Sequence, residues 1–157
     1  MKIQCWTIGK GHESYVNEGI VIFTKRISHY YPVDWLILAS PKNMQNANED
    51  EIREQEGLLI LKNIKPEDYL ILLDERGKML SSPELANFIL SRANESKKQL
   101  VFLIGGAYGV SKDVHKRANF TWSLSPLVFP HQLVRLMLSE QIYRACTIIK
   151  NEKYHHS

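Results

Sequence analysis

The chain lacks the features that mark membrane and secreted proteins. Its longest apolar runs, such as residues 35–39 and 100–104, are far shorter than the roughly 20 residues that a membrane-spanning helix needs. The polar Gln4 and the charged stretch 9–13 interrupt what would be the apolar region of a secretion signal. We therefore expect a cytoplasmic protein without a membrane segment.

Cysteine is scarce, and its placement excludes the usual cysteine-based sites. Cys5 and Cys146 lie near opposite ends of the chain in apolar surroundings, with no Cys-x-x-Cys pair and no histidine at metal-ligand spacing. This pattern indicates two buried thiols in a reducing compartment. It predicts no disulfide and no metal site.

Composition indicates one ordinary globular domain over residues 1–157. The chain is 44% hydrophobic and 24% charged, which is typical of a folded protein with a single core. The net charge of +3 is too small to identify a nucleic-acid binder by itself. Acids concentrate in residues 49–56 and bases in residues 112–117, so we expect one acidic and one basic surface.

Apolar runs of strand length alternate with segments of helical periodicity, which predicts an α/β domain with a parallel sheet. We expect strands at residues 3–8, 35–39, 69–73, 100–104 and 121–124. We expect helices at residues 13–28, 50–61, 82–96, 112–118 and 130–150. The third helix is the clearest, because Ser82-Pro83-Glu84 offers an N-cap, a proline at the first helical position and an acid in the first turn.

The last predicted helix is apolar around most of its circumference. The residues responsible are Leu133, Val134, Leu136, Met137, Leu138, Ile142, Ala145, Cys146, Ile148 and Ile149. One packing face cannot bury them all, so the helix needs two partners. A second subunit is the favoured second partner, because two-fold dimers are the commonest closed assemblies. A wholly internal helix is the alternative.

The familiar phosphate-loop, nucleophile-elbow and zinc-helix motifs are absent from the sequence. Three loops remain, each after a predicted strand, where open parallel sheets bind ligands. Residues 74–78 are charged and fit a solvated turn. The glycine-rich residues 105–109 allow close approach of a ligand, or simply form a tight turn. The apolar residues 123–131 could cover a flat adenine ring, a partner chain or the core.

Polar side chains cluster at both ends of the last helix. His131 and Arg135 project from one face at its start, where positive charge opposes the helix dipole, which points to binding of an anion or substrate. A solvated arginine, or one paired with an acid such as Glu140, is the alternative. Tyr154 and His155 follow its end and could stack on a base and contact phosphate. A frayed tail is the alternative for this pair.

In combination, these segments resemble the ribosomal RNA large subunit methyltransferase H family, which belongs to the SPOUT class of RNA methyltransferases. The resemblance covers essentially the whole chain. The matching segments are residues 8–10, 73–78, 104–106 with Gly109, 124–126, 129–135, 140–145 and 154–155.

The resemblance implies a one-domain α/β fold with a C-terminal trefoil knot, active only as a homodimer. It implies methylation of N3 of a pseudouridine in 23S rRNA on the assembled ribosome, with S-adenosylmethionine as methyl donor and no metal. The implied cofactor pocket comprises Leu73, Gly105, Leu124, Ser125, Pro126, Leu127, Val128 and Phe129. The charges of Asp74, Glu75 and Arg76 receive no role.

We interpret the remaining candidates within this framework. His131, Tyr154 and His155 are candidate proton acceptors or base-orienting groups. Arg135 and Arg144 are expected to hold RNA phosphate or polarise base carbonyls, because arginine suits bidentate contacts. Lys112 and Lys116 are expected to bind RNA. We expect Tyr154 and His155 of one subunit to complete the site of the other, and Trp122 to lie near the cofactor.

Two other functions fit parts of the sequence. A flavodoxin-like module could use Gly105, Gly106 and Gly109 to bind the phosphate of a nucleotide or flavin, but it leaves the apolar loop 124–129 unexplained. A noncatalytic ribosome-binding protein could keep the dimer and the basic surface. It would bind ribosomes regardless of cofactor.

Overall fold

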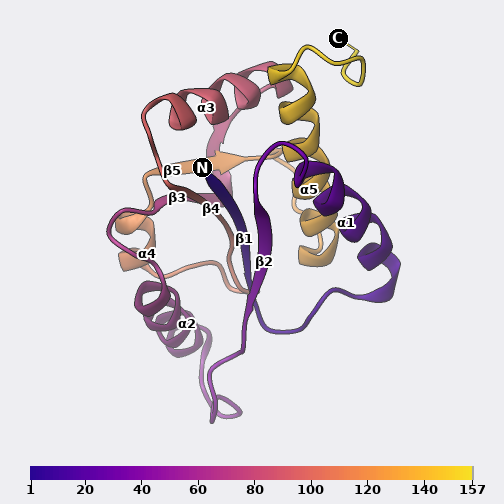
Figure 1. Ribbon diagram of the computed structural model, residues 1–157. Coiled ribbons are helices and arrows are strands. Elements are labelled where there is room, and N and C mark those ends of the chain that lie inside the picture. Colours follow the sequence, from indigo (N-terminus) through magenta and orange to yellow (C-terminus); the bar gives the residue numbers. More distant parts are fainter. Residues whose placement is uncertain (157) are drawn as a thin grey trace.

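Strands and helices alternate along the whole described chain (Figure 1). The computed structural model describes residues 1–156. The elements are β1 (Lys2–Ile8), α1 (Ser14–Ile27), β2 (Val33–Leu38), α2 (Glu49–Asn63), β3 (Tyr69–Met79), α3 (Ser82–Asn94), β4 (Gln99–Ile104), α4 (Lys112–Arg117), β5 (Phe120–Ser123) and α5 (His131–Ile149). All strand pairs are parallel, in the order β2-β1-β4-β3-β5. The predicted α/β class is confirmed.

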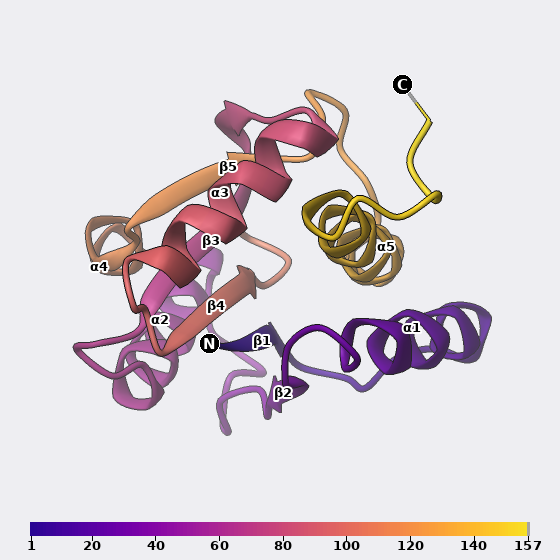
Figure 2. The same ribbon diagram turned by 45° about the horizontal axis from the view of Figure 1, so that its top comes forward.

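Helices cover both faces of the sheet, giving three layers (Figure 2). Residues of α1, α3 and α5 form one hydrophobic cluster with the sheet, and residues of α2 and α4 form a second on the opposite face. The central strand β4 is buried on both sides because its side chains alternate between the clusters. Leu100, Phe102 and Ile104 point into the first cluster, and Val101 and Leu103 into the second.

All the predicted helices and strands are present. At most of their ends, the observed bound differs from the predicted one by a few residues. The cap of α3 is one residue earlier than expected: the Ser81 side chain accepts from the Glu84 amide, and the Glu84 carboxylate accepts from the Ser81 amide. This reciprocal pair is a capping box, which satisfies two backbone N–H groups at the helix start.

Strand β3 is the clear exception, because it continues to Met79 instead of ending at Leu73. Its pairing with β5 shifts register between Leu73 and Lys78. Gly77 makes this possible, since any Cβ there would lie 2.7 Å from the backbone carbonyl of Thr121. The charged residues 74–78 are thus part of a strand, and the expected solvated turn is wrong.

Helix α5 finds its partners within the same chain. It lies close to α1, where a Cβ on Gly19 would approach the Leu136 side chain to 2.6 Å. It contacts α3 through the Ser82 hydroxyl, which donates to the Gln141 side-chain oxygen over 2.8 Å. Together with the sheet, α1 and α3 account for much of the apolar surface of α5. Leu133 and Met137 stay half-buried.

Both thiols are buried, as the sequence predicted. Cys5 and Cys146 are free cysteines inside the core around α5. Burial raises the pKa of the Cys146 thiol to about 12 and that of Cys5 still further. Protonated, inaccessible thiols are unreactive, so neither cysteine is a candidate nucleophile.

Candidate active site

The three segments singled out in the sequence meet at one cavity. It has a volume of about 320 Å³ and lies beside the middle of β3 and the carboxyl ends of β4 and β5. Its lining comes from residues 72–76, 104–110 and a segment between 122 and 134. Of the predicted cofactor-binding residues, the cavity is lined by Leu73, Gly105, Leu124, Ser125, Leu127, Val128 and Phe129. Pro126 is not among the lining residues.

Helix α2 holds the glycine turn that forms one wall. Gly109 has a φ of +80° and donates its amide to the Gly106 carbonyl over 3.1 Å, which closes the turn. Arg53 of α2 donates from Nε to the Tyr108 carbonyl over 2.9 Å. Glu56 packs on Gly106 so closely that a Cβ there would lie 2.8 Å from its carboxyl carbon. Only glycine fits at position 106 without displacing this carboxyl group.

Glu56 is an unusual neighbour for such a turn. Its Oε2 is buried and has no hydrogen-bond partner among residues 1–156. Burial raises the pKa of the carboxyl group, because the charged form loses hydration. The turn therefore rests on a carboxyl group that ionises less readily than a solvated glutamate.

The apolar loop after β5 has a fixed turn and exposed side chains. The Ser125 hydroxyl accepts the Leu127 amide over 3.1 Å, and the Ser123 hydroxyl donates to the Ser125 carbonyl over 2.9 Å. Leu127 and Val128 are 67% and 80% exposed. Large apolar side chains at a ligand-binding sheet edge favour a covering ligand or partner chain.

Trp122 reaches the cavity from β5, as expected. It is only 2% exposed and meets the Phe102 ring edge-on, with ring centroids 6.1 Å apart. Its indole Nε1 is buried without a hydrogen-bond partner among the described residues. A buried N–H donor next to a cavity is costly unless a bound molecule accepts from it.

Asp74 supplies a fixed negative charge at the cavity. Its carboxylate accepts from the Arg76 side chain over 2.9 and 3.0 Å and from the Arg76 amide over 2.9 Å. Hydrogen bonds from Arg76 lower the pKa of Asp74, so the carboxylate stays ionised. Asp74 had no role in the sequence-based expectations, in which only Leu73 of this segment was assigned to the cofactor pocket.

His131 and Arg135 belong to neighbouring but different environments. His131 lines the cavity and stays exposed to solvent on one side, but desolvation by its neighbours together with the Arg135 cation lowers the pKa of its imidazole. Arg135 is only 3% exposed and does not line the cavity. Its Nη1 donates to the Lys10 carbonyl over 3.0 Å and lies 3.3 Å from His12 Nδ1. Arg135 thus holds the loop after β1 within this chain.

Comparison with known proteins agrees with this geometry. Residues 1–155 match the model of a family described as predicted SPOUT methyltransferases. The chain is 47% identical to ribosomal RNA large subunit methyltransferase H of Cytophaga hutchinsonii over 99% of its own length and 100% of the relative's. The corresponding protein of Parabacteroides distasonis is 44% identical over 99% of both chains. The chain belongs to the ribosomal RNA large subunit methyltransferase H family.

A solved structure of a more distant protein shows a similar fold. It is described as a probable methylase family protein from Haemophilus influenzae, with a TM-score of 0.54 and 12% identity. The alignment covers 99% of this methyltransferase-family chain and 70% of that structure. At this identity the likeness concerns the fold alone.

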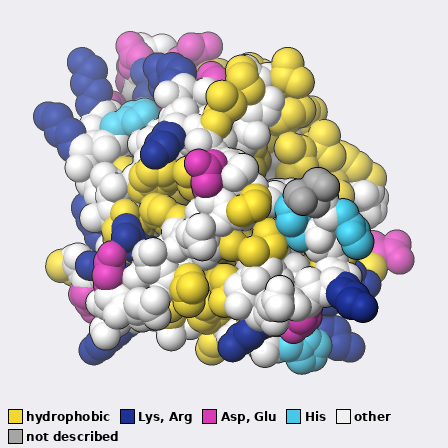
Figure 3. Space-filling model, turned by 90° about the horizontal axis from the view of Figure 1, so that it is seen from above, with side chains coloured by type: hydrophobic (Ala, Val, Ile, Leu, Met, Phe, Trp, Pro, Cys, Tyr) yellow, Lys and Arg dark blue, Asp and Glu magenta, His cyan; other side chains and the backbone are white. Residues whose placement is uncertain are grey.

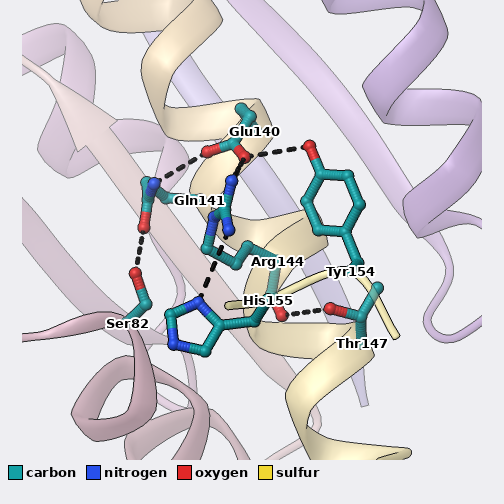
Figure 4. A network of polar contacts seen from close by, with 7 residues as sticks. All are labelled: Ser82, Glu140, Gln141, Arg144, Thr147, Tyr154 and His155. Carbon is teal, nitrogen blue, oxygen red and sulfur yellow. Dashed lines mark hydrogen bonds and ion pairs between the residues drawn. The ribbon is translucent and has the colours of Figure 1, made fainter. Parts of the chain in front are cut away.

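The C-terminal candidates of this methyltransferase-family chain form a separate network around Glu140 (Figure 4). Glu140 accepts from Arg144 over 2.6 and 3.1 Å, from Tyr154 over 3.1 Å and from Gln141 over 2.7 Å. Arg144 stacks over the Tyr154 ring, 4.7 Å from its centroid, and lies 3.4 Å from His155 Nδ1. Arg144, Tyr154 and His155 come together here but do not line the cavity.

The predicted RNA-binding lysines line a second, more open cavity. Lys112 and Lys116 of α4 face it, and its volume is about 740 Å³. Asp74 and Arg76 line both cavities, so the two are adjacent. The candidate cofactor cavity and the cavity lined by the predicted RNA-binding lysines thus share a wall.

Arg53 and Glu56 support the site but were not predicted from the sequence. They lie in α2, about 50 residues before the glycine turn that they hold. No local motif encodes such a long-range contact. The acidic composition of residues 49–56 even favours an exposed helix face. The one local feature that indicates close packing here is Gly57, next to Glu56, which lets α2 approach Ser111.

Among residues 1–156, no three His, Cys, Asp or Glu side chains form a group that could hold a metal ion. No helix in this part of the chain is both long and apolar enough to cross a membrane.

Proposed function

We propose that this protein is a cytoplasmic homodimer that transfers a methyl group from S-adenosylmethionine to N3 of a pseudouridine in 23S rRNA of the assembled ribosome. The observation that carries the proposal is the cavity lined by the middle of β3 and by the two loops that follow β4 and β5, in a chain that matches the family over residues 1–155. Open parallel sheets bind ligands at the carboxyl ends of their strands.

The cavity fits a cofactor with a flat apolar ring and polar edges. Leu124, Leu127 and Phe129 offer apolar surface, and the backbone of the turn around Gly105 offers amides and carbonyls. The unpartnered Nε1 of Trp122 is a further donor for a bound molecule. When bound, S-adenosylmethionine supplies an electrophilic methyl group on a sulfonium. The protein's part is to orient the RNA base and to exclude water.

His131 is the best-supported proton acceptor of the three candidates. The imide N–H of the target base must lose its proton, and a neutral imidazole at the cavity can accept it. Desolvation and Arg135 lower the pKa of His131, which favours that neutral form at pH 7. Burial and the hydrogen bond to Glu140 raise the pKa of Tyr154, so its hydroxyl remains a donor.

The distance between the two halves of the candidate machinery supports a homodimer. His131 begins α5, whereas Arg144 lies about 20 Å further along the helix axis. A second copy could bring the Glu140 network to the cavity. Half-buried Leu133 and Met137 and exposed Val128 offer apolar surface for it. Figure 3 shows hydrophobic side chains gathered on one side of the face seen from above.

The path of the chain supports the C-terminal knot as part of the same proposal. The chain leaves β5 at one edge of the sheet, and α5 then packs against α1, which connects the two strands β1 and β2 at the other edge. The chain therefore crosses back over the sheet after β5.

The charge of the chain supports action on the assembled ribosome. A net charge of +3 neutralises few phosphates, so naked RNA would bind weakly through its backbone. A preassembled surface offers additional contacts. Arg144, Lys112 and Lys116 are the proposed RNA contacts, although Arg144 is paired with Glu140 in the single chain.

Calorimetric titration with S-adenosylhomocysteine tests the cofactor site, with the stoichiometry fitted per dimer. Saturable binding is expected, and labelled methyl donor with large ribosomal subunits then identifies the modified base. Absence of binding both alone and with ribosomes present would reject the proposed function.

Removal of residues 153–157 tests the role of the tail. The truncation deletes Tyr154 and His155 but leaves every residue that lines the cavity. We expect methyl transfer to be lost and affinity for S-adenosylhomocysteine to stay within a few-fold. Retained turnover would show that the tail has no catalytic part.

A further inference from the structure

A basic groove lies beside the candidate cofactor cavity. It has a volume of about 740 Å³ and is lined by Asp74, Arg76, Gly77, Lys78, Lys112, His115, Lys116 and Thr121. One wall is the extended part of β3, and the other is α4. The close approach of Gly77 to the Thr121 backbone fixes the base of the β3 wall.

The groove has more positive charge than its own acid can neutralise. Asp74 is already held by Arg76 at 2.9 Å and lies 3.7 Å from His115 Nε2. Lys78, Lys112 and Lys116 are exposed, and none forms an ion pair within residues 1–156. Lys112 and Lys116 are one helical turn apart, so both project toward the groove. Three free ammonium groups therefore face one channel.

The methyl donor does not explain these charges. S-adenosylmethionine carries no phosphate, and its one anionic group, a carboxylate, is accompanied by an ammonium and a sulfonium, so it cannot balance three lysines. Anionic oxygens repeated along a chain are the natural partners of several ammonium groups in a groove, and a nucleic-acid backbone provides them. Because Asp74 and Arg76 line both cavities, a strand in the groove passes directly beside the candidate cofactor cavity.

We propose that this groove binds the sugar-phosphate backbone of the rRNA strand that carries the target base, with Lys78 as a contact in addition to Lys112 and Lys116. The inference rests on the proposed function, since it concerns that reaction's substrate. It assigns a phosphate-binding role to the charged end of β3, with Asp74 and Arg76 as its border with the cofactor cavity.

The test compares Lys78→Gln and a triple Lys78→Gln, Lys112→Gln, Lys116→Gln variant with the wild type. Binding to large ribosomal subunits and to a 23S rRNA fragment is measured at several salt concentrations. Each lost phosphate contact flattens the plot of log affinity against log salt by about 0.7 for a single strand. For the triple variant, the slope of log affinity against log salt should therefore be less steep by about two, and binding at 0.1 M salt should be about 100-fold weaker.

Lys98→Gln is the matched control, because this exposed lysine directly precedes β4, at the amino ends of the strands, and does not line the groove. It should leave both slope and affinity unchanged. An unchanged salt slope in the triple variant would overturn the groove assignment. So would a triple variant that binds ribosomal subunits more weakly but the rRNA fragment as well as the wild type does, because that result would indicate an acidic protein partner.

Cofactor binding separates this inference from the proposed function. All variants should bind S-adenosylhomocysteine like the wild type, because the three lysines do not line the cofactor cavity. If the wild type bound no cofactor, the proposed function would fail while the salt slopes would still report on the groove.

Discussion

His131 owes its proposed role to its surroundings at the start of α5. Desolvation and the Arg135 cation one turn away lower the pKa of the imidazole below 6.5, so the ring is neutral and able to accept a proton above that pH. We predict that His131→Gln slows methyl transfer by about 100-fold or more. The affinity for S-adenosylhomocysteine should change only a few-fold.

The pH profile provides the decisive measurement for His131. Protonation removes the acceptor, so the wild-type rate at saturating cofactor should fall as the pH drops below 6.5. The His131→Gln profile should lack this decrease. His29→Gln serves as the control, because His29 is exposed beyond the end of α1. An unchanged profile in His131→Gln would assign the proton to another group.

The contact between Gly106 and Glu56 can be tested with a double-mutant cycle, which measures the coupling energy of the two residues. In Gly106→Ala the new Cβ would meet the Glu56 carboxyl carbon at 2.8 Å, so the turn or the carboxyl group must move. We predict about 10-fold weaker binding of S-adenosylhomocysteine, measured by calorimetry. Adding Glu56→Ala should restore most of the loss, giving a coupling of about 1 kcal/mol, as for residues in direct contact.

Gly11→Ala is the control for this cycle, since nothing lies within 4 Å of its would-be Cβ. Trp122 fluorescence offers an independent readout, because its indole lines the same cavity. Strictly additive effects of the two substitutions would mean that Glu56 does not support the turn.

Elements were predictable from the sequence where one local pattern determined them. The strand β4 carries its own apolar run and the helix α3 its own cap, and the loops after β4 and β5 follow from the ends of those strands. The extension of β3 was not predictable, because its charges favour a turn and only the long-range contact of Gly77 with Thr121 permits a strand. The support of the glycine turn by Arg53 and Glu56 is equally nonlocal.

Glu140, in the middle of α5, holds the side chains of Arg144 and Tyr154 in place, so its substitution tests the role of this network. Glu140→Gln keeps the shape but removes the charge that holds Arg144 at 2.6 Å. A partly exposed pair at this spacing contributes about 0.5 kcal/mol, so the melting temperature should fall by only about 1–2 °C. Methyl transfer should fall about 10-fold, because Tyr154 and His155 lose their anchor.

Titration of Tyr154 distinguishes this positioning role from a general loss of stability. The Glu140 charge and hydrogen bond help to raise the Tyr154 pKa, so Glu140→Gln should lower it towards 10. Ultraviolet difference spectra follow the phenolate. Glu95→Gln is the matched control, because it breaks a comparable pair with Arg92 on α3. Full activity in Glu140→Gln would contradict the role of the network.

At the scale of the whole molecule, the helix α5 holds the two groups of candidate residues apart. The cavity lies at its beginning, whereas the network begins at Glu140, about 14 Å along the axis from His131, and includes Arg144, about 20 Å along it. Within one chain the tail cannot serve its own cavity without leaving that network. A two-fold dimer resolves this, because each copy can present its tail to the other copy's cavity.

Complementation between two inactive variants tests this arrangement. His131→Gln impairs the cavity, and deletion of residues 153–157 impairs the tail. A heterodimer purified through two different tags contains one site with both defects and one with neither, if tails act across the interface. It should then have about half of the wild-type activity, since a two-fold dimer has two equivalent sites. If each tail served its own cavity, every site would carry one defect and the heterodimer would stay inactive.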